Sequence, residues 1–482
     1  MKSIKIYRLI IIALFFVSLT TKAQDNTMYF MQRIPQSTYT NPAFQPECNW
    51  YIGFPALSEF SFKFQNTGFS YNDLYKPGTG VNNKDSLFPD LYGIVNKLKT
   101  KNYITPEFSN EMFSFGFKIK DIAINFRFSN KTTLQVSYPK DLIAFGVNGN
   151  TSYLNKRADF GVGFNFTNYN EAALGASWKI NDNLSVGATF KYLMGIANIN
   201  FEKMNIGITT KIDTTPATND NYISYDVDAK INTSLPLAVK MNQQGYVDFS
   251  NTKMDTTDLV KKILTNKNYG FGIDFGITYR VWKDLTVTAS VIDLGYINWQ
   301  ATPSNFSGTH TYQFTGFDLA NKNQNTVDLG QVVMDSLKKI QNVVYTQSAY
   351  KTFLTPKIYL GADWVYTKNF SFGALLKNEI YDNTFHPSFT LTAQAKFFKL
   401  WELTASYSMM DNRYDNLGFG ISMRLTPIQI YIVSDNITAA MYPKDATMVN
   451  IRFGINLTFG CKKTEKKVYN EAKPLIDVPK TP

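Results

Sequence analysis

Residues 269–281, YGFGIDFGITYRV, alternate strictly between two kinds of side chain. Every odd-numbered position is aromatic or aliphatic, whereas the even-numbered positions are Gly, Asp, Thr or Arg. A period of two separates the two faces of a β-strand. The run of 13 residues is much longer than the roughly 5–6 residues usual for strands of globular proteins. This stretch therefore predicts a transmembrane strand with one face toward lipid and the other toward a wet lumen.

The alternation recurs along the chain, at 160–166, 172–180, 184–192, 358–366, 370–376, 389–397, 403–409, 417–425 and 449–459. Aromatic residues make up 15% of the chain, yet its mean hydropathy is only −0.21. A membrane helix needs about 20 apolar residues, and no segment after residue 23 comes near that length. We therefore predict an all-β, transmembrane outer-membrane β-barrel over residues 51–460, with about 14–16 antiparallel strands.

The lengths of the connections between these segments also alternate. Short connections are expected at 120–121, 181–183, 282–284, 367–369, 398–401 and 426–427, and the longest at 65–111, 195–268 and 299–356. Bacterial barrels have short periplasmic turns and longer outer loops. This pattern predicts an even number of strands and places both termini in the periplasm. Helical spacing further predicts small helices in the outer loops, at 87–101, 257–266 and 333–350.

The two ends of the chain have their own compositions. Residues 1–23 combine a basic start, an apolar run from Leu9 to Leu19 and a short polar end, which is the plan of a secretory signal peptide. We expect cleavage between Ala23 and Gln24, followed by a periplasmic or plug-like segment at 24–50. Residues 461–482 are charged and predict a flexible periplasmic tail, or else a docking segment for a periplasmic partner. These features predict export to the cell outer membrane.

The charge of the chain and the motifs that it contains limit the activities and partners that we expect. The chain has a net charge of +11. The expected signal peptide contains four basic residues and no acidic one, so the mature chain has a net charge of +7. No basic helix or arginine cluster indicates a nucleic-acid partner. The two histidines, His310 and His386, fall in expected outer loops, and no phosphate loop, nucleophile elbow or zinc spacing occurs. We therefore expect no enzyme activity, no cofactor and no metal site.

The only two cysteines flank the expected barrel. Cys48 precedes the first strand and Cys461 follows the last. These strands are neighbours in a closed barrel, and the periplasm permits disulfides. We hypothesise a Cys48–Cys461 disulfide that pins the seam, against the alternative of two unrelated thiols.

A short motif, Asn41-Pro42-Ala43, lies between the signal peptide and the first strand. Proline fixes its own φ and biases the preceding residue toward an extended conformation. Two interpretations stay open: a tight turn that enters the barrel, or a plug inserted into the lumen.

Several segments resemble a known family. Asn41-Pro42-Ala43, YPKDL at 138–142, the segment 168–195 and VIDLGYINW at 291–299 resemble an uncharacterised outer-membrane β-barrel family of Bacteroidota, a domain of unknown function. The tripeptide alone also resembles the start of long-chain fatty-acid transporter-like barrels, where it lies in a lumenal hatch, and of barrels associated with type IX secretion and gliding. The resemblance implies a barrel and an outer-membrane location, with no assigned activity.

Two functions are consistent with this sequence. The first is a channel or transporter for a small hydrophobic or amphiphilic solute, and the second is a scaffold of a secretion, gliding or surface complex that binds a periplasmic or secretion-complex protein. Outer-membrane lipid is a partner in both cases. Polar positions on strands would line the lumen, or pair with one another inside it: Arg127, Lys191, Asp274, Arg280, Asp363 and Arg424.

Overall fold

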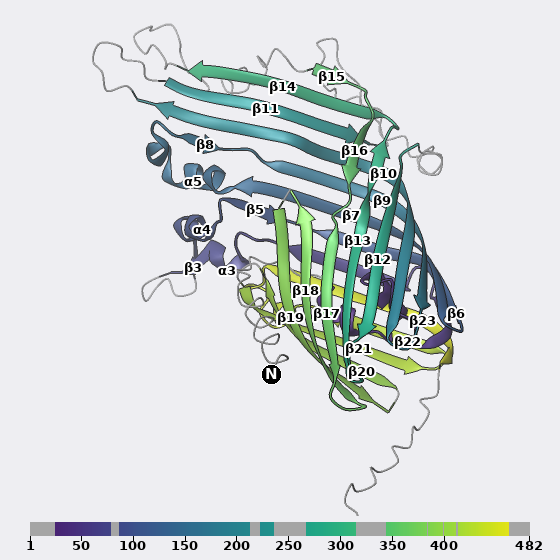
Figure 1. Ribbon diagram of the computed structural model, residues 1–482. Coiled ribbons are helices and arrows are strands. Elements are labelled where there is room, and N and C mark those ends of the chain that lie inside the picture. The colour runs from purple at the N-terminus through teal and green to yellow at the C-terminus, as the bar shows by residue number, and fades with distance from the viewer. Residues whose placement is uncertain are drawn as a thin grey trace, which may run out of the picture.

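The computed structural model describes residues 25–78, 86–212, 222–235, 267–314, 344–382, 384–398, 400–410 and 413–461. Within these residues, 14 antiparallel strands close into one barrel (Figure 1). The predicted fold class is confirmed, at the lower end of the expected strand number. No helix in the described ranges is long and apolar enough to cross a membrane.

The barrel wall follows the order of the chain, and each strand pairs antiparallel with the next. Its first strand has two parts, β1 and β2, which both pair with β6 on one side and with β23 on the other. The barrel strands are β1 (Cys48–Gly53), β2 (Glu59–Gln65), β6 (Glu107–Ile119), β7 (Ile122–Pro139), β9 (Gly163–Lys179), β10 (Leu184–Lys211), β12 (Tyr269–Arg280), β13 (Leu285–Trp299), β17 (Lys357–Val365), β18 (Phe370–Tyr381), β19 (Thr384–Phe397), β20 (Trp401–Met410), β21 (Arg413–Leu425), β22 (Ile428–Ser434) and β23 (Met448–Cys461).

The interruption between β1 and β2 leaves the wall closed. Phe54 donates its N–H to the carbonyl of Ile455 at 2.9 Å, and Ile455 donates in turn to the carbonyl of Leu57 at 2.9 Å. On the other side, the N–H of Ala56 reaches the carbonyl of Met112 at 2.9 Å. Backbone hydrogen bonds therefore span residues 54–58 on both sides, as an apolar membrane requires.

The strand β12 shows the alternation that the sequence predicts. Its odd-numbered side chains are exposed, from Ile273 at 36% to Phe275 at 50%, whereas Asp274 is fully buried. Connections of 2 to 4 residues join β6–β7, β9–β10, β12–β13, β17–β18, β19–β20 and β21–β22. Because successive strands are antiparallel, these six connections share one end of the barrel, here called the short-turn end. The other is the loop end; it carries the long connections, together with two-residue turns at β18–β19 and β20–β21.

One side of the wall is much taller than the rest. β10 has 28 residues, compared with 9 in β17. Its first half pairs with β12, while its second half pairs with β11 (Tyr222–Ser234), which pairs in turn with β14 (Pro303–Phe314). We call this extension, formed by the second half of β10 with β11 and β14, the tall wall; it projects from the loop end in Figure 1. β8 (Arg157–Asp159), β15 (Val344–Thr346) and β16 (Tyr350–Phe353) pair along the upper parts of β10, β14 and β13.

The strands of the tall wall lie in segments that the sequence predicted to be loops. Residues 195–268 and 299–356 were expected to be connections, but they contain the end of β10 and all of β11, β14, β15 and β16. The expected helix at 87–101 is shorter: α4 (Leu91–Lys97) lies between the short strands β4 (Leu87–Pro89) and β5 (Lys101–Ile104). The expected helix at 257–266 and most of that at 333–350 lie outside the described residues; in the latter, residues 344–346 form β15 instead. The other small elements are α2 (Asn26–Phe30), η1 (Pro35–Tyr39), α3 (Tyr71–Leu74), β3 (Tyr75–Pro77), α5 (Lys140–Asn148), η2 (Thr151–Tyr153) and α8 (Thr438–Met441).

A disulfide joins the first and last barrel strands. Cys48 and Cys461 are opposite one another in the β1–β23 register, and their Sγ atoms are bonded. The bond lies at the short-turn end, where the chain enters β1. It therefore covalently closes the wall at the strand pair that begins and ends the barrel.

Candidate functional site

Residues 25–47, here called the plug, lie inside the barrel. Met28, Met31 and Ile34 are fully buried and pack against Tyr431 and Val433 of β22. On the opposite side, the aromatic rings of the plug pack against strands β13, β17 and β18; this cluster comprises Tyr29, Phe30, Phe44, Ile292, Tyr359 and Leu375. Apolar side chains of a short segment thus fill the centre of a lumen that is otherwise polar.

Buried polar groups of the plug also bond to the wall. Thr27 donates its backbone N–H and its hydroxyl to Asp435, at 2.8 and 2.6 Å. The amides of Gln36 and Asn456 exchange two hydrogen bonds, at 2.8 and 2.9 Å. Buried polar groups must be satisfied in this way, because an unpaired one costs about 1–3 kcal/mol. Asp435 and Asn456 lie on the β22–β23 side of the lumen. On the side of β13, the hydroxyl groups of Tyr29 and Thr288 share a hydrogen bond of 2.8 Å, so the plug is bonded on both sides.

Glycines of the inner wall make room for the plug. A Cβ added at Gly276 would lie 2.0 Å from Oδ1 of Asn41, and one at Gly187 would lie 2.2 Å from the carbonyl oxygen of Pro42. Further along the wall, a Cβ added at Gly373 would lie 2.2 Å from the ring of Phe30. These positions thus form a seat in which any larger side chain would collide with the plug.

The motif Asn41-Pro42-Ala43 makes a turn and also contacts the wall. Oδ1 of Asn41 accepts the N–H of Ala43 at 2.9 Å, which closes the turn. Nδ2 of Asn41 lies 3.4 Å from the carbonyls of Ile277 and Ala289, on β12 and β13. The two interpretations of the motif therefore describe a single arrangement, a turn that rests on the inner wall.

The plug leaves the lumen at the short-turn end. Glu47 pairs with Arg33 at 3.3 Å and with Arg424 of β21 at 3.0 Å. Burial raises the pKa of Glu47, but the two guanidinium groups outweigh this and hold it below its ordinary value. The other end of the plug, Asp25, lies within the lumen and pairs with Arg452 at 2.5 Å. The first described residue is therefore inside the barrel.

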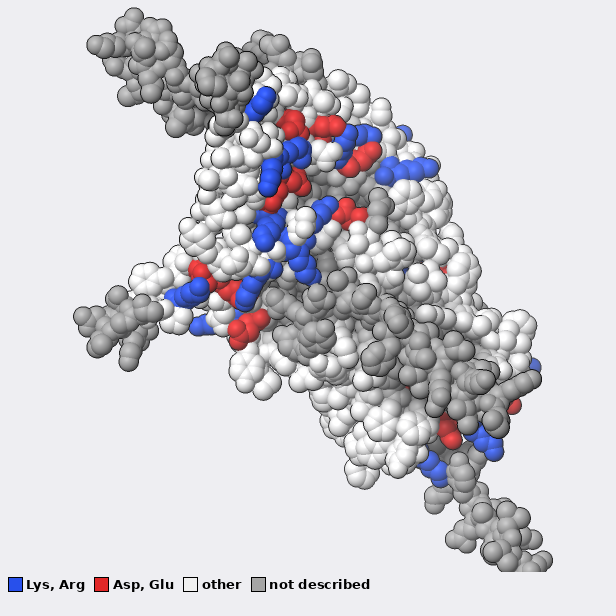
Figure 2. All heavy atoms as spheres, turned by 60° about the vertical axis from the view of Figure 1, so that its left-hand side comes forward, with Lys and Arg blue, Asp and Glu red and all other residues white. Residues whose placement is uncertain are grey.

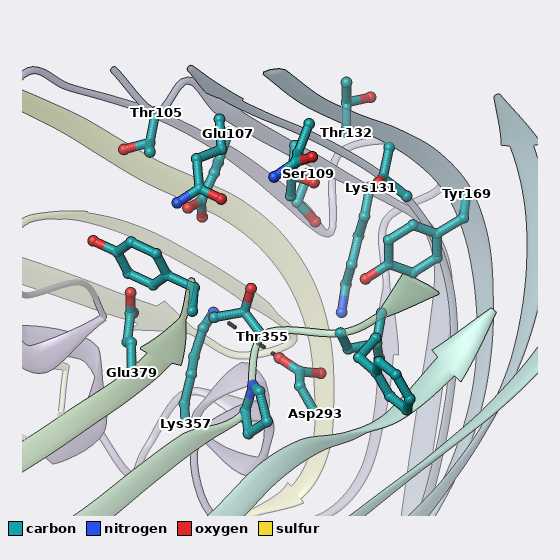
Figure 3. Close-up of a pocket in the computed structure, with 18 of the residues that line it drawn as sticks. Thr105, Glu107, Ser109, Lys131, Thr132, Tyr169, Asp293, Thr355, Lys357 and Glu379 are labelled. Atoms are coloured by element: carbon teal, nitrogen blue, oxygen red, sulfur yellow. Dashed lines mark ion pairs between the residues drawn. The ribbon is translucent and has the colours of Figure 1, made fainter. Parts of the chain in front are cut away.

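A cavity of about 1060 Å³ lies between the plug and the loop end. Figure 3 shows charged side chains of both signs that point into it from β6, β7, β13, β17 and β18: Glu107, Lys131, Asp293, Lys357 and Glu379. Toward the loop end the lining becomes more apolar, with Tyr350, Phe353 and Leu354. We call these two parts the charged floor and the apolar rim of the outer cavity.

Most charges on the floor have a partner in the wall behind them. Glu107 pairs with Lys63 at 3.0 Å, and Glu379 pairs with Lys377 at 2.8 Å. Charges that leave water need such partners, because an isolated buried ion is very unfavourable. The floor is therefore a set of fixed charges, held in place before any solute arrives.

The structure places five of the six predicted lumenal charges inside the barrel. Arg127 pairs with Glu171 at 2.9 Å, Lys191 pairs with Asp274 at 2.6 Å, and Arg424 bonds to the base of the plug. Asp363 is half-buried on β17. Arg280 is the exception: it faces the same way as Asp274, but it ends β12 and is exposed at the rim of the short-turn end. The prediction for Arg280 was wrong because alternation gives the face of a strand and not the depth.

The histidines also differ from expectation. Both lie on strands rather than in outer loops, His310 on β14 and His386 on β19. His386 is buried and stacks on the ring of Tyr381, with the centroids 3.7 Å apart. Among the described residues, no group of three or more His, Cys, Asp or Glu side chains is arranged to hold a metal ion.

Asp293, a central residue of the floor, was not predicted from the sequence. Asp293 has a φ of 61° and lies where the β12–β13 register shifts. Its N–H donates to Oδ1 of Asp274 at 2.8 Å, and its carboxylate binds Lys191 at 2.6 Å. A β-bulge inserts an extra residue and reverses the alternation beyond it. Strict alternation assigns Asp293 to the lipid face, together with Val287 and Val291, and so no simple pattern reveals it.

Residues 42–435 match DUF5723, described as a family of unknown function. The chain belongs to this family. The resemblance to an uncharacterised barrel family is thereby confirmed. None of the curated protein sequences matches this DUF5723 member.

Solved barrels resemble the DUF5723 member in architecture. A FadL homologue of Pseudomonas aeruginosa matches with a TM-score of 0.40 and 11% identity, over 92% of this chain and 100% of the other. The toluene transporter TodX of Pseudomonas putida matches with a TM-score of 0.33 and 10% identity, over 88% and 91%. The translocator domain of the autotransporter NalP of Neisseria meningitidis matches with a TM-score of 0.31 and 9% identity, over 90% and 96%. Barrels named for different roles are thus similar to this one, and the likeness is one of architecture only.

Proposed function

We propose that this DUF5723 member is an outer-membrane channel or transporter whose lumen is closed by its own plug. Its outer cavity receives a small amphiphilic solute. The observation that carries this proposal is the juxtaposition of a preformed cavity of about 1060 Å³ and a plug buried directly beneath it. Ligand cavities of proteins typically measure about 300–1,000 Å³, so the outer cavity has the size of a specific site.

The two parts of the outer cavity support an amphiphilic solute. A purely apolar molecule would displace water from the charged floor without replacing its hydrogen bonds, which is unfavourable. A purely charged molecule would leave the apolar rim unused, including Phe353, whose side chain is 80% exposed. A solute with a polar head and an apolar body satisfies both parts.

The proposed route passes the plug rather than the wall. Hydrogen bonds on both sides of residues 54–58 close the interruption in the first strand. Passage therefore requires displacement of the plug, which the glycine seat and the contacts of Thr27 and Gln36 oppose. Since Asp25 of the plug also lines the outer cavity, a solute bound there can contact the plug directly.

Planar-bilayer conductance tests the role of the plug. A variant that lacks residues 26–44 but retains Glu47 and Cys48 is compared with the full chain, each refolded in detergent. We expect the deletion to raise single-channel conductance at least tenfold, because it removes the apolar centre of the lumen. The exposed variant R280Q is the control and should behave as the full chain. Equal conductance of the deletion variant and the full chain would overturn the proposal.

Orientation is part of the same proposal. We infer that a signal peptide is removed between Ala23 and Gln24 and that the short-turn end faces the periplasm, as in other bacterial barrels. The outer cavity then opens to the outside. Whole cells that carry R280C or K230C, at opposite ends of the barrel, can be labelled with a membrane-impermeant maleimide. Labelling of K230C alone is expected, and labelling of R280C alone would reverse the orientation.

The tall wall favours a second candidate function, that of a scaffold. Its inner face carries ion pairs, such as Arg157–Asp226 at 2.7 Å and Lys230–Glu202 at 2.7 Å. Figure 2 shows acidic and basic side chains intermixed over the upper part of the face in view. Its outer face is apolar, with Ile206, Ile208, Tyr225, Val227 and Tyr312 in register. An apolar face beyond the membrane is typical of a protein interface. A photo-crosslinker at Tyr225 should capture a defined partner that one at Thr311, on the charged face, does not.

A further inference from the structure

The floor of the outer cavity presents accessible charges of both signs. The side chains of Glu107 and Lys131 are 33% and 24% exposed, and those of Asp293 and Lys357 are 14% and 17% exposed. All four point into the cavity in Figure 3. Together with the less exposed Glu379, the floor has three acids and two bases. It therefore offers short-range contacts to anionic and to cationic groups.

Lys357 differs from the other three. Glu107 pairs with Lys63 at 3.0 Å, Lys131 with Glu171 at 2.7 Å, and Asp293 with Lys191 at 2.6 Å. Among the described residues, the one ion pair of Lys357 is a long contact of 3.9 Å to Asp293. An ammonium group has three donors, and a largely buried cation with unused donors is unfavourable. The Nζ of Lys357 is therefore placed to bind an anionic group that enters the cavity.

The neighbouring carboxylate is held at a conformational cost. The left-handed region of φ is strained for a residue other than glycine, and Asp293 has a φ of 61°. Lys191 and the acceptor Asp274 hold it there. Because of the bulge, the carboxylate of Asp293 points into the cavity, whereas strict alternation would point it toward lipid. It lies there beside Lys357, at the long distance of 3.9 Å.

We infer that the charged floor recognises the zwitterionic head of the solute, a carboxylate at Lys357 and an ammonium group at Glu107. This inference rests on the proposed function and names the substrate class. A short peptide with apolar side chains has this chemistry: its termini match the floor and its side chains match the rim. Glu107 is the acid assigned to the ammonium group because its side chain, at 33%, is more exposed than that of Asp293, at 14%.

Isothermal titration of the purified full chain with three related ligands tests the inference. Leucyl-leucine carries both charges, N-acetyl-leucyl-leucine lacks the ammonium group, and leucyl-leucine amide lacks the carboxylate. We expect leucyl-leucine to bind at least tenfold more tightly than either analogue. Equal affinity for the three ligands, or binding of laurate without binding of leucyl-leucine, would overturn the inference.

Variants assign the two contacts separately. K357M should abolish the preference for leucyl-leucine over its amide and leave the preference over the acetylated analogue. E107Q should do the reverse, and R280Q should change neither. Because a variant can misfold, K357R serves as a folded comparison that retains the preference. A K357M protein that loses affinity for all three ligands by the same factor, with its fold intact by heat-modified migration, would contradict the assignment.

The two proposals can fail separately. If deletion of the plug raises conductance but leucyl-leucine does not bind, the zwitterion inference falls and the channel stands. If leucyl-leucine binds with the expected preferences while deletion of the plug has no effect on conductance, the site stands and the plugged channel falls.

Discussion

The glycine seat leads to a prediction that isolates the plug from the wall. Gly276 and Gly272 lie on the same strand and both face the lumen. A Cβ at Gly276 would lie 2.0 Å from Oδ1 of Asn41, whereas one at Gly272 would find its nearest neighbour, Cδ of Lys191, at an ordinary 3.4 Å. Neither glycine has a positive φ, so alanine fits the backbone at both positions. G276A should therefore displace the plug, and G272A should leave it in place.

The magnitude follows from the contacts that are lost. Overpacking of a tight site costs roughly 1–3 kcal/mol. The shift of Asn41 also weakens its long contacts of 3.4 Å to the carbonyls of Ile277 and Ala289, at about 0.5 kcal/mol each, the lower end for a hydrogen bond. The sum is about 2–4 kcal/mol, which corresponds to a shift of roughly 30- to 700-fold in the equilibrium between seated and displaced plug.

Single-channel recording measures this shift as the ratio of open to closed time. We expect the ratio to rise by at least 30-fold in G276A and by less than threefold in G272A. Unheated and heated gel migration establishes that both barrels are folded. If the two variants gate alike, the plug does not depend on the glycine seat and the reasoning is refuted.

Three further predictions concern the disulfide, the base of the plug and the buried charges. Replacement of Cys48 and Cys461 by serine should lower the free energy of unfolding in urea by about 2–5 kcal/mol, and addition of reductant should change the gel migration of the unfolded wild type but not that of the variant. The pKa of Glu47 is lower in the folded protein than its unfolded value of about 4.3, so its carboxylate stabilises the seated plug fully above that value and loses this effect as the pH falls through the folded value. The fraction of time that the channel is open should therefore rise below about pH 4. E47Q should show the same raised open time at neutral pH. K191M leaves two buried carboxylates without their cation and should destabilise the barrel by about 3–5 kcal/mol, whereas R280Q should change stability in urea by less than 0.5 kcal/mol, roughly the limit for an exposed substitution.

The barrel itself could be predicted because its requirements are local. In β12, each side chain faces lipid or lumen according to its position alone, and the buried Asp274 and exposed Phe275 follow that rule. The turns of β6–β7 and β9–β10 also lie where the apolar pattern breaks. Five of the six lumenal charges followed from the same rule. A membrane wall one strand thick leaves little room for tertiary context to override the pattern.

Features that depend on other parts of the chain could not be predicted. Two β-bulges reverse the alternation, one on β10 between Phe201 and Lys203 and one on β13 at Asp293. Because of these bulges, strict alternation predicts neither the strands of the tall wall nor the inward position of Asp293. The role of Gly276 is set by Asn41, which lies more than two hundred residues away in the sequence. A glycine on a lumenal face has the same local pattern whether it faces water or a plug.

The position of Asp25 has a practical consequence for all of these experiments. This residue lines the outer cavity and pairs with Arg452 on its wall. An affinity tag or fluorescent label fused directly before it would have to occupy the space in which solute binding is to be measured. An apparent loss of binding in such a fusion would report obstruction by the label. Labels for purification or imaging are better placed beyond Cys461, at the opposite end of the barrel.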